Sequence, residues 1–132
     1  TNANFYEQNA ASYIQTLTEL DTEIQQNLSD VKNRAFIVFH PAWGYFAEDY
    51  ALEQIPIEIE GKEPSAQDLA HLIEEAEEHN ITVVFASPQF NPKSAEVIAE
   101  GIGGRVVFID PLARDYATNM RIVAAELVQG MN

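Results

Sequence analysis

Three short runs of β-branched and aromatic residues constrain the fold most strongly. They occupy residues 35–39, 81–86 and 105–109, and each is apolar along most of its length. Such runs predict strands that are buried on both faces, as in parallel sheets. A weaker strand at 55–59 contains Pro56, which places it at an edge of the sheet.

Helical segments lie between these strands. Ser65, followed three residues later by Asp68, predicts a capping box that opens a helix over 69–79. Two more helices are predicted over 92–102 and 116–131, and the first ends at Gly103 and Gly104. The alternation predicts an α/β lobe with a mostly parallel four-stranded sheet flanked by helices.

The N-terminal segment predicts an unusually long helix. Its apolar residues recur at steps of three and four, which defines one helical face. A continuous helix would be roughly 40 Å long, which suggests a strut that connects two units. We therefore divide the chain into a connecting helix, 1–32, and an α/β lobe, 33–132; alternatively, at least half of the helix packs across the lobe itself. The apolar face consists of Tyr6, Ala10, Tyr13, Leu17, Leu20, Ile24, Leu28 and Val31.

Composition excludes several functions. The net charge of −14, from 21 acidic and 7 basic residues, disfavours nucleic-acid binding. The absence of cysteine excludes disulfides and thiolate zinc sites. No membrane-spanning stretch or signal segment is present in the sequence, which fits either a cytoplasmic protein or a processed or truncated chain.

Polar residues end three of the predicted strands. His40, Ser87 and Asp110 each follow an apolar run and precede a proline. Proline keeps the preceding residue extended, and ligands of open parallel sheets bind beyond the carboxyl ends of the strands. These three side chains are therefore predicted to lie at the mouth of one cleft.

His40 and Asp110 can both ligate a metal. Imidazole suits zinc, and carboxylate suits zinc or manganese. The residues alone favour a structural interpretation, in which Asp110 caps the next helix and His40 is a core histidine. An enzyme would need this pair as acid and base beside Ser87, and no nucleophile-elbow or other catalytic motif supports that.

A longer motif surrounds His40. The segment Phe39-His-Pro-Ala-Trp-Gly-Tyr-Phe46, followed by Tyr50-Ala-Leu52, is similar to the central motif of zinc- and manganese-specific solute-binding proteins of ABC importers. Other segments follow in that family's order, so the resemblance covers essentially the whole chain. They are Asn9-Ala-Ala-Ser-Tyr13, Gly61-Lys-Glu-Pro-Ser65, Val83-Val-Phe-Ala-Ser-Pro-Gln89, Val106-Val-Phe-Ile-Asp-Pro-Leu112, Tyr116 and Asn119-Met120.

The resemblance implies a receptor of two α/β lobes, joined by the long helix, that clamps a metal between them. It implies that His40 and Asp110 are metal ligands and that Trp43 and Tyr45 are cleft walls or supports. Ser87 stands where many members carry an acidic residue. The family's N-terminal lobe supplies further histidine ligands, and nothing in this sequence corresponds to it.

We therefore expect the C-terminal lobe of an extracytoplasmic receptor, which binds zinc or manganese and delivers it to a membrane permease. Half a site should bind metal weakly, and the long helix could support a homodimer that pairs two sets of ligands. The alternative is a stand-alone α/β interaction or regulatory domain with a cleft at the same strand ends.

Overall fold

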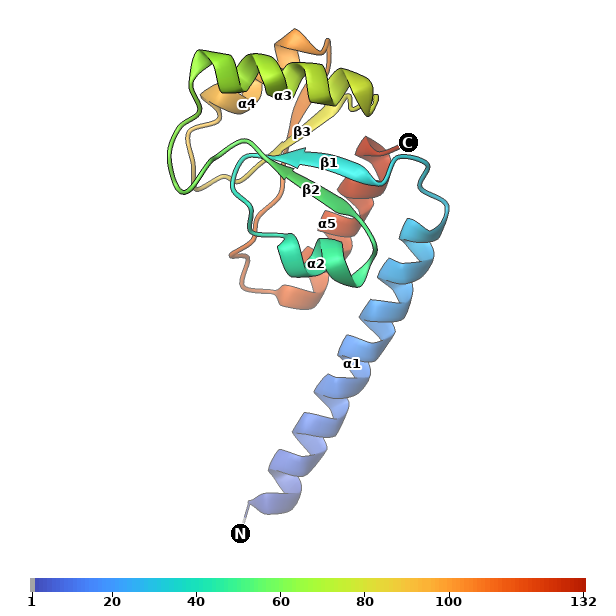
Figure 1. Ribbon diagram of the computed structural model, residues 1–132. Helices are drawn as coiled ribbons and strands as arrows, with labels where there is room; N and C mark the ends of the chain where they lie inside the picture. Colours follow the sequence, from blue (N-terminus) through green and yellow to red (C-terminus); the bar gives the residue numbers. More distant parts are fainter. Residues whose placement is uncertain (1) are drawn as a thin grey trace.

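A four-stranded, all-parallel sheet lies between two layers of helices, and one long helix projects from it (Figure 1). The computed structural model describes residues 2–132. The strand order is β2-β1-β3-β4. The elements are α1 (Ala3–Ser29), β1 (Ala35–Val38), α2 (Gly44–Asp49), β2 (Glu53–Pro56), α3 (Ala66–Glu78), β3 (Val83–Ala86), α4 (Lys93–Gly101), β4 (Arg105–Phe108) and α5 (Tyr116–Gly130).

The two central strands, β1 and β3, are buried at every position, as predicted. Pro56 lies in the edge strand β2, also as predicted. The expectation that β4 is buried on both faces was wrong, because β4 forms the opposite edge and Phe108 is 53% exposed. An apolar run has the same appearance in a central strand and in an edge strand, so sequence alone did not separate them.

The sheet carries a core on each face because its side chains alternate. On one face, Phe36 and Phe85 meet edge to face, with ring centroids 6.1 Å apart. The α1, α2 and α5 helices complete this core. On the other face, Ile37 and Val84 pack against α3 and α4.

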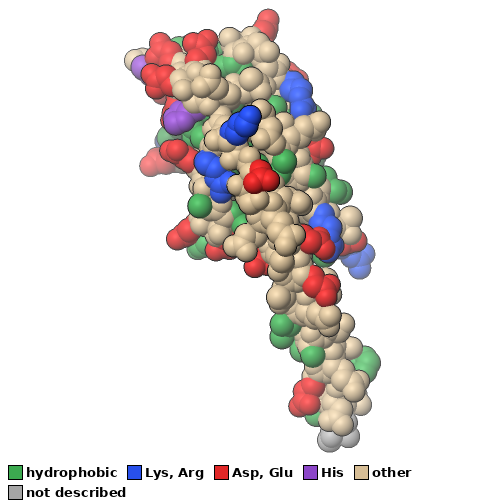
Figure 2. Space-filling model, turned by 90° about the vertical axis from the view of Figure 1, so that its right-hand side faces the viewer, with side chains coloured by type: hydrophobic (Ala, Val, Ile, Leu, Met, Phe, Trp, Pro, Cys, Tyr) green, Lys and Arg blue, Asp and Glu red, His purple; other side chains and the backbone are tan. Residues whose placement is uncertain are grey.

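Only the C-terminal half of α1 packs on the lobe. Leu20, Ile24 and Leu28 are buried, whereas every residue from 2 to 15 is exposed. The alternative that at least half of the helix packs across the lobe holds for the C-terminal half, which lies against α5. Figure 2 shows the exposed half as a narrow stalk with hydrophobic side chains along it.

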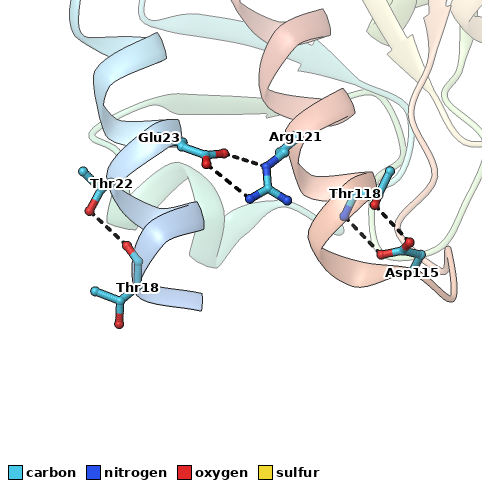
Figure 3. Close-up of polar contacts among 6 residues, drawn as sticks. All are labelled: Thr18, Thr22, Glu23, Asp115, Thr118 and Arg121. Atoms are coloured by element: carbon cyan, nitrogen blue, oxygen red, sulfur yellow. Dashed lines mark hydrogen bonds and ion pairs between the residues drawn. The ribbon is translucent and has the colours of Figure 1, made fainter. Parts of the chain in front are cut away.

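Polar contacts attach α1 to the lobe. Arg121 of α5 donates to both carboxylate oxygens of Glu23, at 2.6 and 3.3 Å (Figure 3). These hydrogen bonds lower the pKa of the Glu23 carboxyl. Arg34 donates to the carbonyl oxygens of Leu28 and Tyr50, at 2.6 and 2.5 Å, and so joins the end of α1 to the end of α2. The six-residue α2 helix was not predicted, because it is too short to show a period.

Local sequence sets the other helix ends. Ser65 and Asp68 form the predicted capping box of α3. Asp115 caps α5 by accepting from the Thr118 amide and hydroxyl, at 3.2 and 2.9 Å (Figure 3). The predicted turn after α4 requires glycine at position 104, where a Cβ would lie 2.2 Å from the carbonyl oxygen of Thr82.

Candidate metal-binding face

The carboxyl ends of the parallel strands bring the predicted site residues to one edge of the sheet. His40 lies just beyond β1, Ser87 directly follows β3, and Asp110 lies just beyond β4. The pairing of β1 with β2 continues past both strands, because the Glu58 amide donates to the carbonyl oxygen of Phe39 at 3.0 Å. This register places Glu58 beside His40.

His40 is held by a mostly buried carboxylate. Its Nδ1 lies 3.1 Å from Oε2 of Glu58, whose side chain is only 10% exposed, while the His40 side chain is 39% exposed. A carboxylate accepts from Nδ1–H and leaves the lone pair of the imidazole on Nε2, which is the arrangement that metal-ligating histidines use. The interpretation of His40 as an enclosed core histidine does not fit this exposure.

Asp110 forms a tight turn at the end of β4. Its Oδ1 accepts from the Leu112 amide at 2.9 Å and from Nε2 of Gln89 at 2.6 Å. Its Oδ2 has no hydrogen-bond partner among residues 2–132. The alternative that Asp110 caps the following helix was wrong, because Asp115 occupies that position.

One turn contacts both candidate ligands. The Phe90 ring stacks on the His40 ring, with centroids 4.9 Å apart and an interplanar angle of 30°. The preceding residue, Gln89, donates to Asp110. The turn that follows β3 therefore orients the imidazole on one side and the carboxylate on the other.

The sequence interpretation missed Glu58, Gln89 and Phe90. A signal for Glu58 was present, because extending a parallel pairing of the first two strands by two residues sets it opposite His40. Gln89 falls within the motif that carried the family resemblance, but nothing in the sequence marked it as a partner of Asp110. Phe90 resembles any apolar loop residue.

The other predicted residues differ in their surroundings. Ser87 is fully buried and Trp43 is 5% exposed. In the described part of the chain, neither the Ser87 hydroxyl nor the Trp43 indole N–H has a hydrogen-bond partner. Tyr45 is 87% exposed on α2, and no hydrogen bond within residues 2–132 connects it to His40 or Asp110.

The described residues contain no group of three or more His, Cys, Asp or Glu side chains arranged to hold a metal ion. Two candidate ligands are fewer than the four that zinc takes in most protein sites.

None of the described helices has the length and apolar character needed to span a membrane.

A parallel α/β lobe with polar groups at its strand ends, and with a helix that leaves the lobe at one side, fits the class of ligand-binding receptor lobes. The family model described as ZnuA, zinc-uptake complex component A, periplasmic, matches residues 1–130, and the chain belongs to this family. This match confirms the resemblance inferred from the motif around His40. The family consists of substrate-binding transport proteins and is not an enzyme family.

The chain is similar to curated zinc proteins. It is 38% identical over 111 residues to the high-affinity zinc uptake system protein ZnuA of Haemophilus influenzae, covering 80% of this chain and 32% of that protein. It is 34% identical over 131 residues to the zinc-binding protein AdcA of Streptococcus pyogenes, covering 90% and 25% respectively.

Solved structures share the fold. A crystal structure of ZnuA has a TM-score of 0.97 and 48% identity, and a ZnuA deletion mutant with zinc bound has a TM-score of 0.93 and 48% identity. Each comparison covers 99% of this chain and 50% of the other. The chain therefore spans about half of the solved proteins and a smaller share of the curated relatives.

Proposed function

We propose that this chain is the C-terminal lobe, with the connecting helix, of the zinc receptor of an ABC importer. The receptor binds the ion outside the cytoplasm, between this lobe and a second one, and delivers it to a membrane permease. The contact between Nδ1 of His40 and the mostly buried Glu58 carboxylate is the observation that carries the proposal, because it leaves the Nε2 lone pair free, as in metal-ligating histidines.

In this proposal, His40 offers Nε2 and Asp110 offers Oδ2 to the metal. Glu58, Phe90 and Gln89 hold these groups in place before the ion arrives, which lowers the entropic cost of binding. The partly exposed imidazole and carboxylate remain open toward a second lobe, which completes the coordination. The buried Ser87 and Trp43 support the floor of this cleft, and Tyr45 forms part of its rim.

Zinc is the proposed native ion, and manganese is the second metal that the receptor would bind. Imidazole is a good ligand for zinc, whereas manganese sites are richer in oxygen ligands. The names of the similar proteins from H. influenzae and S. pyogenes also specify zinc. The lobe performs no covalent chemistry on the ion, and the exposed carboxylates of this acidic chain are suited to guiding a basic surface of the permease.

The division between connecting helix and lobe is part of the proposal. The chain turns between Ser29 and Ala35, which fits a boundary near residue 32. Leu20, Ile24 and Leu28 nevertheless belong to the core of the lobe. The connecting function therefore falls mainly on the exposed residues 2–15.

The test is calorimetric titration of the full-length receptor with zinc. His40→Ala removes one ligand and should weaken zinc binding by at least about 10-fold, in line with the loss seen even for residues that only support ligands. His71→Ala is the matched control, because His71 is an exposed histidine within α3 and is not one of the residues that follow a strand. Equal zinc affinity for both variants and the parent would overturn the assignment.

A further inference from the structure

A hollow lies where α1, α2 and α5 meet, and its lining includes neither His40 nor Asp110. It has a volume of about 320 Å³. Two carboxylates, Asp21 and Asp49, and three phenols, Tyr45, Tyr50 and Tyr116, line it. Its remaining wall is apolar and includes buried Phe46 and Met120. We call this hollow the tyrosine–carboxylate notch.

The polar groups of the notch converge on Tyr50. Its hydroxyl donates to Oδ1 of Asp21 at 2.7 Å. Burial, this hydrogen bond and the charges of Asp21 and Asp49 raise the pKa of the Tyr50 phenol. Among residues 2–132, no lysine, arginine or histidine lines the notch, and Arg121 is paired with Glu23 instead.

This combination of groups suits an organic cation. Carboxylates attract the charge, and the faces of tyrosine rings attract it further. A guanidinium fits best, because its plane stacks on an aromatic ring while its N–H groups donate to a carboxylate; a lysine ammonium satisfies the same charges. The apolar wall accommodates the methylene groups of either side chain.

The course of α1 indicates where such a side chain comes from. Leu17 of α1 lines the notch, and the helix leaves the lobe there, with Tyr13 and Ile14 already 54% and 63% exposed. The solved ZnuA chains are about twice as long as this one. In the proposed two-lobe receptor, the other half is connected through this stalk, which leaves the lobe at the notch.

We propose that the notch receives a lysine or arginine side chain from the N-terminal half of the same receptor, forming an interlobe contact separate from the metal ligands. This inference rests on the proposed function, since it needs the second lobe.

The first measurement is carboxyl footprinting with a carbodiimide and an amine, read by mass spectrometry, on the full-length receptor and on the 132-residue chain. Asp21 and Asp49 should be protected in the receptor and labelled in the shorter chain. Asp30, an exposed carboxylate at the end of α1, should be labelled in both. Equal labelling of Asp21 and Asp49 in both proteins overturns the proposal. Protection of these carboxylates in the shorter chain that grows with its concentration also overturns it, because it indicates that a second copy of the chain covers the notch.

The second measurement tests the charge of the occupant. Asp21→Asn with Asp49→Asn should lower the Tm of the full-length receptor by about 2–4 °C at low salt, and by less at high salt. The same change should not lower the Tm of the 132-residue chain. The control, Asp30→Asn with Glu100→Gln, removes two exposed carboxylates elsewhere. Protection of the notch without this selective loss identifies an uncharged cover and overturns the proposal.

Zinc titration separates this inference from the proposed function. The Asp21 and Asp49 variant should retain zinc binding, because neither residue is a candidate ligand. A receptor that shows the notch contact but binds no zinc refutes the proposed function alone. A receptor that binds zinc but leaves the notch open refutes the notch contact alone.

Discussion

His40 and Glu58 meet across the edge of the sheet, with Nδ1 of the imidazole 3.1 Å from Oε2 of the carboxylate. They lie 18 positions apart and are joined by the parallel register of β1 with β2. The contact directs Nε2 away from the carboxylate, and a ligand at the strand ends meets a histidine that is already oriented.

Glu58→Gln should weaken zinc binding by the full-length receptor by about 10-fold or more while leaving the fold intact. The amide still occupies the space but no longer carries the charge that raises the basicity of the imidazole. Calorimetry with zinc gives the affinity, and circular dichroism checks the fold. Glu53→Gln, an exposed change on the same strand, is the control and should bind as the parent does.

The two halves of α1 should respond differently to the same substitution in the 132-residue chain. Ile24→Ala removes a fully packed side chain, 2% exposed, and should lower the free energy of unfolding by about 2–5 kcal/mol. Ile14→Ala removes a side chain that is 63% exposed and should change it by no more than about 0.5 kcal/mol. Urea unfolding followed by circular dichroism measures both. Similar losses would mean that the stalk is covered in solution.

The capping box of α3 predicts a pH dependence. Hydrogen bonds from the Ser65 hydroxyl and amide lower the pKa of the Asp68 carboxyl. The stabilising contribution is therefore fully present above the ordinary aspartate pKa of about 3.9 and is lost as pH falls through the lowered value. The Tm difference between the parent and Asp68→Ala should be largest near neutral pH and should shrink in acid. A difference that stays constant down to about pH 2 would argue against the carboxylate as its source.

The 132-residue chain alone should bind zinc weakly, because His40 and Asp110 leave most of the coordination to water. Titration should give an affinity poorer than micromolar for a monomer verified by light scattering.

The exposed apolar face of the stalk, which includes Tyr6 and Tyr13, favours self-association at high concentration. Tight zinc binding by a verified monomer would contradict the prediction that this chain holds only half of a metal site. A chain that stays monomeric at every concentration would rule out the predicted homodimer.

Several elements could be predicted because their causes are local. Apolar runs define the strands, Ser65 and Asp68 define the start of α3, and Pro56 identifies an edge strand. The prolines after His40 and Asp110 mark the strand ends, and the motif around His40 identified the family. The roles of these two residues as metal ligands remain a prediction.

Other features depend on which segments meet in space. The apolar stripe of α1 continues with the same period on both sides of Leu17, so its periodicity did not indicate where packing ends. The β4 strand contains the same Val-Val-Phe run as β3, yet its position in the strand order leaves Phe108 exposed. Tyr45 lies within the motif around His40, yet its position on the short α2 helix leaves it 87% exposed.

The amino-acid sequence by itself determined the α/β class, the family and the two candidate ligands at the strand ends. The partners of those ligands were decided only by the tertiary structure. Glu58 reaches His40 through strand register, and Gln89 and Phe90 reach Asp110 and His40 through a single turn. Hydrophobic periodicity and local turn chemistry act over a few neighbouring residues, whereas these contacts need the sheet assembled, with its strands in order and its side chains packed.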